Sequence, residues 1–216
     1  ECLTQAGGKG ANQAYAAGKL GVPVAMIGKV GADAYGEALI DNLKRAGVEV
    51  SGIEISKNFP TGRAFVMLEQ NGENRIVVIP GANQDIQPEM ITRHNKLLDA
   101  CDVVVMQLEI PLDVVVYAAK EAKKRGKLVI LDPAPASRNL PNELLKNVDI
   151  IKPNETELSE ISGVLIKTKE EMELAVSELL NRGVTSVVAT RGEKGVFVAA
   201  EGYQEYFSAE KVPVVD

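Results

Sequence analysis

The chain has 216 residues, of which 45% are hydrophobic and 25% charged, and its net charge is −6. A chain of this length can close one sizeable core, and the acidic balance argues against a nucleic-acid partner. No apolar run approaches the roughly 18 residues that a membrane span needs, and no signal-peptide pattern opens the chain. The two cysteines, Cys2 and Cys101, have no metal-like spacing, so we expect a reducing compartment, the cytoplasm.

The first half of the chain carries helix and strand signals in alternation. The predicted elements are an Ala-rich helix over Asn12–Leu20, a buried strand over Val24–Val30 and a helix over Glu37–Ala46. Two β-rich runs follow, Ala64–Glu69 and Arg75–Ile79, and the Asn-Gly turn between them predicts a hairpin. A hairpin inserted in an α/β chain is a candidate lid.

The second half continues the alternation. The predicted elements are strands over Val103–Gln107, Leu128–Leu131, Ile150–Lys152 and Ser186–Thr190, and helices over Leu112–Arg125, Asn142–Lys146 and Lys169–Arg182. Strand and helix in turn indicate parallel βαβ units, and therefore an α/β fold with a mostly parallel sheet. A last hairpin, Val196–Ala200 with Tyr203–Phe207, is expected to extend the edge of that sheet.

A glycine-rich segment, Gly7-Gly8-Lys9-Gly10-Ala11-Asn12, opens the first predicted helix. Glycines there let successive backbone N–H groups face a bound anion or a cluster of hydroxyls, although a plain flexible turn explains the six residues equally well. The chain has no phosphate-binding loop of the G-x-x-x-x-G-K-[ST] type. Nucleotide binding would have to use other segments.

Over a longer stretch the sequence resembles the ribokinase family of carbohydrate kinases. The resemblance rests on that glycine-rich segment with Gly21 and Gly31, and on five later segments in family order. These are Gly81-Ala82-Asn83, Met106-Gln107-Leu108-Glu109, Asp132-Pro133-Ala134-Pro135-Ala136, Pro153-Asn154-Glu155-Thr156-Glu157 and Thr190-Arg191-Gly192. It covers essentially the whole chain and implies a three-layer fold, as one domain over residues 1–216, with a small β lid from residues 61–80 together with 1–7.

The resemblance implies a sugar site made by Gly8, Lys9, Asn12 and Glu109. Gly8 and Asn12 would contact sugar hydroxyls, and Lys9 and Glu109 would pair and bind the far end of the sugar. Amide, amine and carboxylate groups are the donors and acceptors that recognise a polyol. Glu109 also follows a wholly apolar strand, where α/β proteins bind their ligands, although a solvated strand end remains the alternative. Among sugar substrates, the residues in these segments favour D-ribose.

The resemblance also implies an ATP site. Asn154, Thr190 and Gly192 would contact the nucleotide, and Glu157 would position Mg²⁺, which prefers oxygen ligands and retained waters. Asn154 and Glu157 also form the pattern of a helix capping box, and both roles can hold together. Asp216 would help to bind a monovalent cation, K⁺.

Two departures from the family pattern concern the ends of the chain. The family begins with a strand carrying an Asn and an Asp for the sugar, and it continues beyond a position like Asp216 into Gly-Ala-Gly-Asp, which supplies the anion hole and the catalytic base. We therefore expect truncation at both ends, no catalytic residue within 1–216, and an inactive chain as given. His94, the single histidine, is predicted to be a solvated surface residue.

Three further expectations concern function. The lid of such kinases pairs with that of a second subunit, which implies a homodimer. The intact protein would phosphorylate the 5-hydroxyl of D-ribose with ATP. The alternatives are a kinase for another sugar or a nucleoside, and a non-catalytic sugar- or nucleotide-binding protein on the same fold.

Overall fold

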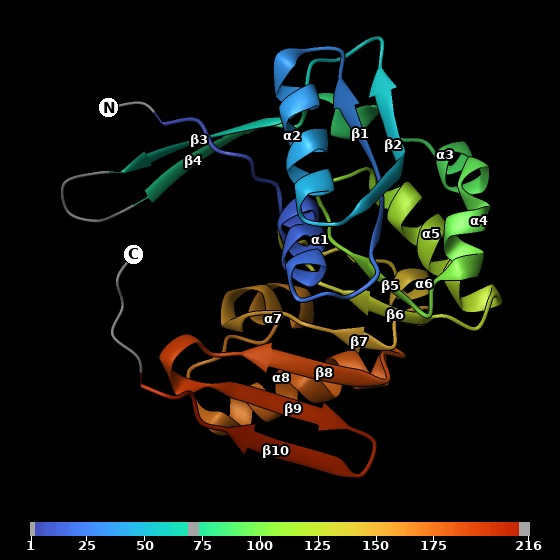
Figure 1. Cartoon of the computed structure of the whole chain (residues 1–216). Helices are drawn as coiled ribbons and strands as arrows, with labels where there is room; N and C mark the ends of the chain where they lie inside the picture. The colour runs from blue at the N-terminus through green and yellow to red at the C-terminus, as the bar shows by residue number, and fades with distance from the viewer. Residues whose placement is uncertain (1–2, 69–73, 212–216) are drawn as a thin grey trace. The chain divides into compact units, whose positions relative to one another are not determined.

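The computed structural model describes residues 3–68 and 74–211, and the chain divides into two compact units (Figure 1). The first unit contains the chain up to Leu97 together with Glu109–Val114. The second contains Leu98–Leu108 and the chain from Val115 onward. Within the described ranges, no helix is long and apolar enough to span a membrane.

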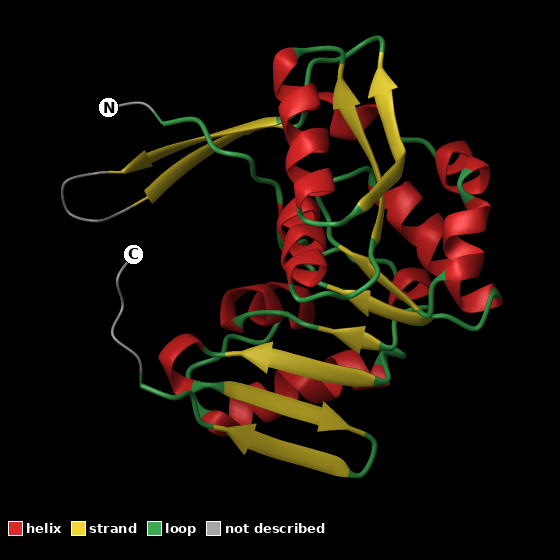
Figure 2. Cartoon of the chain, in the orientation of Figure 1, coloured by secondary structure: helices red, strands yellow, loops and turns green. Residues whose placement is uncertain are grey.

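The first unit is built on two parallel strands. Its elements are α1 (Lys9–Lys19), β1 (Ala25–Gly31), α2 (Ala34–Arg45), β2 (Glu49–Ser56), β3 (Arg63–Leu68), β4 (Asn74–Ile79), the 3-10 turn η1 (Gly81–Asp85) and α3 (Pro88–Arg93). Strands β1 and β2 pair in parallel, and helices α1 and α2 pack beside them (Figure 2). A small core joins these elements, with Leu43, Ala46 and Val48 fully buried and Tyr15 and Met26 packed against them.

The second unit is a six-stranded mixed sheet. Its elements are β5 (Val103–Met106), β6 (Leu128–Leu131), α6 (Asn142–Leu145), β7 (Ile150–Ile151), α7 (Glu155–Ser162), α8 (Lys169–Asn181), β8 (Ser186–Thr190), η2 (Gly192–Lys194), β9 (Val196–Ala200) and β10 (Tyr203–Phe207). The chain passes between the units within α4 (Asn95–Ala100), between Leu108 and Glu109 after β5, and within α5 (Leu112–Lys124).

The order of the strands in this sheet is β10-β9-β8-β7-β6-β5. Strands β5 to β8 are parallel, whereas β9 and β10 run antiparallel to their neighbours at the far edge. Because the parallel strands end at the same edge, the segments that follow β6, β7 and β8 are brought together there. Helix α8 buries Met172, Val176 and Leu179, and the sheet buries Val187 and Phe197.

The predicted elements agree closely with the observed ones, and the α/β fold and both hairpins are confirmed. Strands β6 and β8 have the predicted bounds, and α8 ends one residue early. The structure adds β2, which the sequence did not indicate, and begins α1 three residues earlier, at Lys9. Residues 1–7 were expected to join the lid; residues 1–2 lie outside the described residues, and residues 3–7 have no regular secondary structure.

The hairpin that the sequence predicts as a lid, called the lid hairpin below, is the antiparallel pair β3–β4, which projects from the rest of the first unit in Figure 1. Its root is fixed by Thr61, a buried polar residue whose hydroxyl donates to Asp33 Oδ1 (2.6 Å) and accepts the Gly31 N–H (2.9 Å). The Thr61 N–H donates to Asp33 Oδ2 at 2.9 Å. At Gly81, φ is +54°, and an added Cβ atom would clash with the Pro60 carbonyl oxygen. The backbone segments at the base of the hairpin are therefore packed closely against each other.

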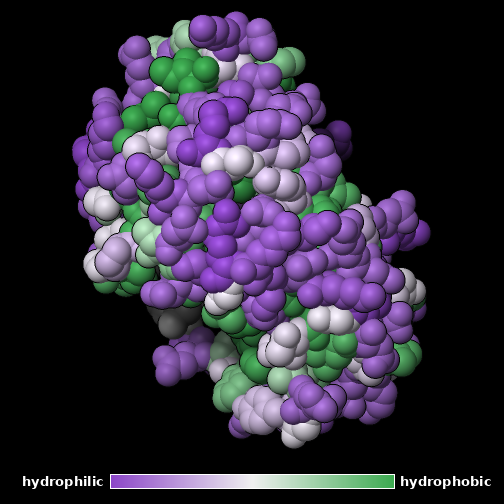
Figure 3. All heavy atoms as spheres, turned by 90° about the vertical axis from the view of Figure 1, so that its right-hand side faces the viewer, coloured by the Kyte–Doolittle hydropathy of each residue, from purple (hydrophilic) through white to green (hydrophobic). Residues whose placement is uncertain are grey.

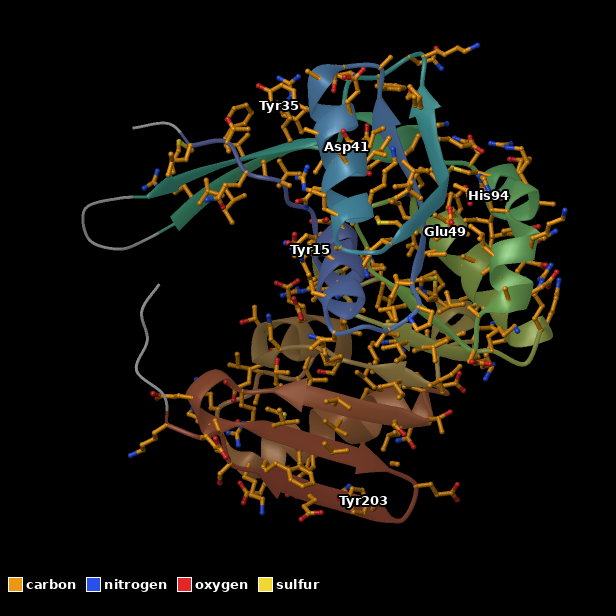
Figure 4. All side chains as sticks on the ribbon, viewed as in Figure 1. Tyr15, Tyr35, Asp41, Glu49, His94 and Tyr203 are labelled. Atoms are coloured by element: carbon orange, nitrogen blue, oxygen red, sulfur yellow. The ribbon has the colours of Figure 1, made fainter. Side chains whose placement is uncertain are left out.

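Asp33 serves two elements at once. It is the N-cap of α2 and accepts the Gly36 N–H at 2.9 Å. Tyr35, labelled in Figure 4, lies in the first turn of α2, and the guanidinium of Arg63, at the start of β3, lies over its ring. Hydrogen bonds from the Thr61 hydroxyl and then from the Thr61 and Gly36 N–H groups lower the pKa of Asp33 to about 2 from the usual 3.8. The ionised carboxylate therefore links the lid to the helix.

We expect Asp33→Asn to destabilise the protein by about 1–2 kcal/mol at pH 7, after a discount for solvent screening of a partly exposed group. The side-chain NH2 group of asparagine would face one of the N–H donors and could not accept its hydrogen bond. Because the folded pKa is lowered, the contribution of Asp33 is complete above about pH 4 and is lost as the pH falls toward 2, so the two proteins should converge there. Urea unfolding at several pH values measures the difference.

The matched control for this variant is Asp41→Asn. Asp41 lies on the same helix with a side chain that is 62% exposed, and it pairs with Lys44 one turn away (Figure 4). Its effect should stay within about 0.5 kcal/mol at every pH. An Asp33→Asn protein as stable as this control at pH 7 would show that Asp33 does not fix the lid root.

Candidate functional site

The glycine-rich segment ends where α1 begins. Gly8 is the N-cap of α1 with φ of +100°, a conformation that favours glycine, and it provides no side chain to cap the helix. A Cβ atom added at Gly7 would meet nothing within 4 Å among the described residues, so the backbone before the helix is open on that side. The first N–H groups of α1 are thus available to a partner from elsewhere in the fold.

That partner is Glu109, which lies one hundred residues further along the chain. Its Oε2 accepts the Lys9 backbone N–H at 3.3 Å, and its Oε1 lies 3.5 Å from the Lys9 ammonium nitrogen. The structure therefore brings together Lys9 and Glu109, the two residues that the resemblance pairs in a sugar site. The side chains are 42% and 31% exposed, so the pair is reachable from solvent.

Part of this contact is structural. The first turn of α1 contains no acidic residue, and the Glu109 carboxylate supplies the negative charge that a helix N-terminus favours. An ion pair this exposed is worth only about 0–1 kcal/mol in stability. Asn12 lies one turn after Lys9 on the same face of α1 and is exposed. The N-terminus of α1 thus carries a cation and an amide within one turn, with the Glu109 carboxylate beside it.

In the second unit, Asn154 and Glu157 form the predicted capping box at the start of α7. The Asn154 side chain accepts the Glu157 N–H at 2.8 Å, and Glu157 Oε2 accepts the Asn154 N–H at 2.8 Å. The box fixes the direction of the Glu157 carboxylate and uses one of its two oxygens. The structural interpretation of the pair is confirmed, and the other oxygen, Oε1, is the group to consider for a metal-bound water.

Thr190 lies beside this cap. It forms a parallel bridge with Asn154, its N–H donates to the Pro153 carbonyl oxygen at 2.9 Å, and its hydroxyl reaches the same oxygen at 3.5 Å. Gly192 follows in η2 with φ of +54°, and a Cβ there would meet nothing within 4 Å among the described residues. The three residues assigned to the nucleotide, Asn154, Thr190 and Gly192, therefore belong to two adjoining segments at one sheet edge.

The structure shows an ion pair at this edge that the sequence reasoning missed. Asp132 follows β6 and Lys152 follows β7, and the Lys152 ammonium nitrogen lies 3.6 Å from Asp132 Oδ2. The Asp132 side chain is only 15% exposed. Both residues directly follow apolar strands, and the rule that ligands bind at the carboxyl ends of parallel strands would have identified them as candidates.

The Mg²⁺ assignment fits the donors in part. Among the described residues there is no group of three His, Cys, Asp or Glu side chains that could enclose a metal. Mg²⁺ commonly keeps several waters and shares its remaining ligands between one carboxylate and the phosphates of a nucleotide. A single oriented carboxylate such as Glu157 suits that arrangement. Asp216, the residue assigned to K⁺, lies outside the described residues.

His94 differs from its expected state. It ends α3 with a side chain that is only 19% exposed, and its Nε2 lies 3.2 Å from Glu54 Oε1, on β2 (Figure 4). Arg93 donates to both oxygens of Glu54, to Oε1 at 2.9 Å and to Oε2 at 2.7 Å. The expectation of a solvated histidine was therefore wrong, because a strand that the sequence did not indicate supplies its partner.

In comparisons with known proteins, residues 3–216 match the model of the pfkB family of carbohydrate kinases. The chain is 35% identical to a ribokinase of Staphylococcus aureus over 210 residues, 97% of this chain and 69% of that protein. It is 37% identical to a deoxyribokinase of Salmonella typhimurium, with the same two coverages. The structure of an Arabidopsis thaliana ribokinase complexed with ribose and ATP matches 97% of this chain and 68% of that chain, with 34% identity and a TM-score of 0.86.

Proposed function

Because this chain belongs to the pfkB family of carbohydrate kinases, we propose that it transfers the γ-phosphoryl group of ATP to the 5-hydroxyl of D-ribose. The observation that carries the proposal is the contact of Lys9 with Glu109 at the glycine-rich start of α1. Relatives named ribokinase, at 35% and 38% identity over 97% of the chain, support ribose as the acceptor.

In the proposed acceptor site, each residue has a distinct task. Glu109 accepts hydrogen bonds from sugar hydroxyls, Lys9 and Asn12 donate to them, and Gly8 allows the sugar to approach the backbone. A pentose offers several hydroxyls as both donors and acceptors, and a set of mixed polar groups around it sets its orientation. Orientation of the 5-hydroxyl is a large part of what catalysis of phosphoryl transfer requires.

In the proposed phosphate site, Thr190 and Gly192 bind the nucleotide, and Asn154 orients Glu157. Mg²⁺, when bound with the nucleotide, neutralises charge on the transferred phosphoryl group. Glu157 would hold one of its waters through Oε1. We assign no general base among residues 1–216, and we propose the cytoplasm, where ATP is available, as the compartment.

Initial rates of ADP release by the full-length gene product, with ribose, 2-deoxyribose and fructose as acceptors, test the proposal. We expect ribose to give the highest kcat/KM. 2-Deoxyribose is the second candidate, because the relative named deoxyribokinase is as similar to this chain as those named ribokinase. A higher kcat/KM for fructose, or ADP release that does not depend on any sugar, would reject ribose as the substrate.

We also propose that the lid forms a homodimer. In the described parts of β3 and β4 both faces of the hairpin are apolar and exposed, and the cross-strand pair Phe65 and Val77 is exposed by 52% and 50%. A two-stranded sheet is marginal alone, and an exposed apolar patch of this kind indicates an interface. On the face shown in Figure 3, by contrast, apolar side chains lie in small separate groups among hydrophilic ones. A second copy of the same lid is the partner whose surface matches.

Val77→Lys should therefore convert a dimer into a monomer in sedimentation velocity measurements at micromolar concentration. A lysine on one strand of each lid would carry a charge into the shared apolar surface. Val77→Ile, which keeps the surface apolar, is the control and should remain dimeric. A wild-type protein that sediments as a monomer at every concentration would contradict this assembly.

A further inference from the structure

Arg191 joins the two segments of the proposed nucleotide site. It lies between Thr190 and Gly192, and its Nε donates to Glu155 Oε1, in the first turn of α7, at 3.1 Å. The Arg191 side chain is only 18% exposed, whereas that of Glu155 is 37% exposed. The contact adds to the bridge between Thr190 and Asn154, so the loop after β8 is held against the cap of α7 by both backbone and side chain.

The surroundings of Arg191 hold its guanidinium in place. Its central carbon lies 5.5 Å from the ring centre of Tyr206, and that ring stacks on Phe197 with centres 4.2 Å apart. The ammonium group of Lys169 lies 4.6 Å from the same ring centre. An arginine that is packed beside an aromatic ring and bound to a carboxylate has little freedom to reorient.

The first turn of α7 has an excess of negative charge. That turn contains two carboxylates, Glu155 and Glu157, and no cation. Glu157 is the group assigned to magnesium, so its charge is compensated when the metal–nucleotide complex binds. The charge of Glu155 has no such compensation and would repel the phosphates of a nucleotide placed at the helix N-terminus. Arg191 provides the missing positive charge.

We propose that Arg191 is a positioning residue for nucleotide binding, which neutralises Glu155 and keeps its carboxylate turned away from the phosphates. The inference rests on the proposed function, since it needs the nucleotide at this edge of the second unit. The sequence alone indicates roles for Thr190 and Gly192 but none for Arg191. Arg191 acts through Glu155 and need not touch the nucleotide.

The test compares four variants with the wild-type protein: Arg191→Met, Arg191→Lys, Glu155→Gln and the double variant Arg191→Met/Glu155→Gln. The affinity for a non-hydrolysable ATP analogue with Mg²⁺ is measured by calorimetry, and the unfolding temperature is measured without ligand. Arg191→Met should weaken nucleotide binding about fivefold, because the repulsion is partly screened by solvent. Arg191→Lys and Glu155→Gln should stay within about twofold of the wild type.

The double variant separates this proposal from a purely structural salt bridge. If Arg191 acts by neutralising Glu155, removing both charges restores the affinity to within about twofold of the wild type, although the salt bridge is still missing. If the salt bridge acts only by holding the loop after β8 against α7, the double variant binds as weakly as Arg191→Met or more weakly, and the proposal is wrong. An Arg191→Met protein that binds like the wild type also overturns it.

The controls distinguish failure of this inference from failure of the proposed function. A wild-type protein that binds no nucleotide would refute the proposed function and the role of Arg191 with it. A wild type that binds, with no rescue in the double variant, would refute only the role of Arg191. Unfolding temperatures identify any variant that does not fold. If Arg191→Met does not fold, Arg191→Lys, which keeps the charge, carries the test, and a loss of affinity in it of more than about twofold would overturn the proposal.

Discussion

Replacing Glu157 by glutamine should lower the turnover of the full-length gene product about 10- to 100-fold and raise the Mg²⁺ concentration needed for half-maximal rate. Glutamine keeps an oxygen that can accept the Asn154 N–H, so the capping box should survive and the unfolding temperature should change little. The loss would then come from the missing negative charge beside the metal. Initial rates over a series of Mg²⁺ concentrations measure it.

The chain contains a matched control for this variant. Glu171 on α8 forms the same kind of capping box, accepting the Thr168 N–H at 2.8 Å, and no ligand is assigned to it. Glu171→Gln should leave both turnover and Mg²⁺ dependence unchanged. If Glu157→Gln behaves like Glu171→Gln in both measurements, Glu157 is a helix cap and nothing more.

Glu109→Gln should weaken ribose binding about 10- to 100-fold, because a hydrogen bond to a charged group contributes about 1.5–3 kcal/mol. The change also removes the carboxylate from the Lys9 ammonium group and the start of α1. Since the pair is partly exposed, stability should fall by no more than about 1 kcal/mol. Calorimetric titration with ribose and thermal unfolding of the same samples separate the two effects.

Glu49→Gln is the control in the same unit. Glu49 is an exposed carboxylate on β2 that accepts the Ser51 N–H at 2.7 Å, two residues away (Figure 4). It has no assigned ligand, so ribose affinity should not change. Ribose affinity that survives Glu109→Gln within about twofold would remove Glu109 from the sugar site and leave it as a partner of the α1 N-terminus.

The sequence predicted correctly those elements whose conformation is determined by neighbouring residues in the chain. Helix α8 begins at a capping box and carries apolar residues at helical spacing before Gly183, and its predicted bounds are within one residue of those observed. The box at Asn154 and Glu157 was predicted for the same reason. Strand β8 is a short apolar run between turn residues, and it was located to the residue.

Features that depend on distant residues could not be predicted in this way. Strand β2 mixes polar residues with Gly52, and it becomes a strand by pairing with β1 rather than by its own pattern. At the start of α1, the Lys9 N–H donates to a carboxylate one hundred residues away. The contacts of Arg191 with Glu155 and of Thr61 with Asp33 join segments that lie far apart in sequence, and nothing in either segment alone indicates its partner.

Transfer of the phosphoryl group to the 5-hydroxyl of ribose is tested most directly by the product, because the position of its phosphate identifies the acceptor atom. The full-length gene product would be incubated with ribose and magnesium-ATP, and the sugar phosphate examined by phosphorus–proton correlation NMR. We expect new phosphomonoester signals, one for each anomer of the product, that couple to the two protons on carbon 5 and together equal the amount of ADP formed. A phosphorus signal coupled to any other sugar proton, or ADP formed together with inorganic phosphate alone, would contradict it.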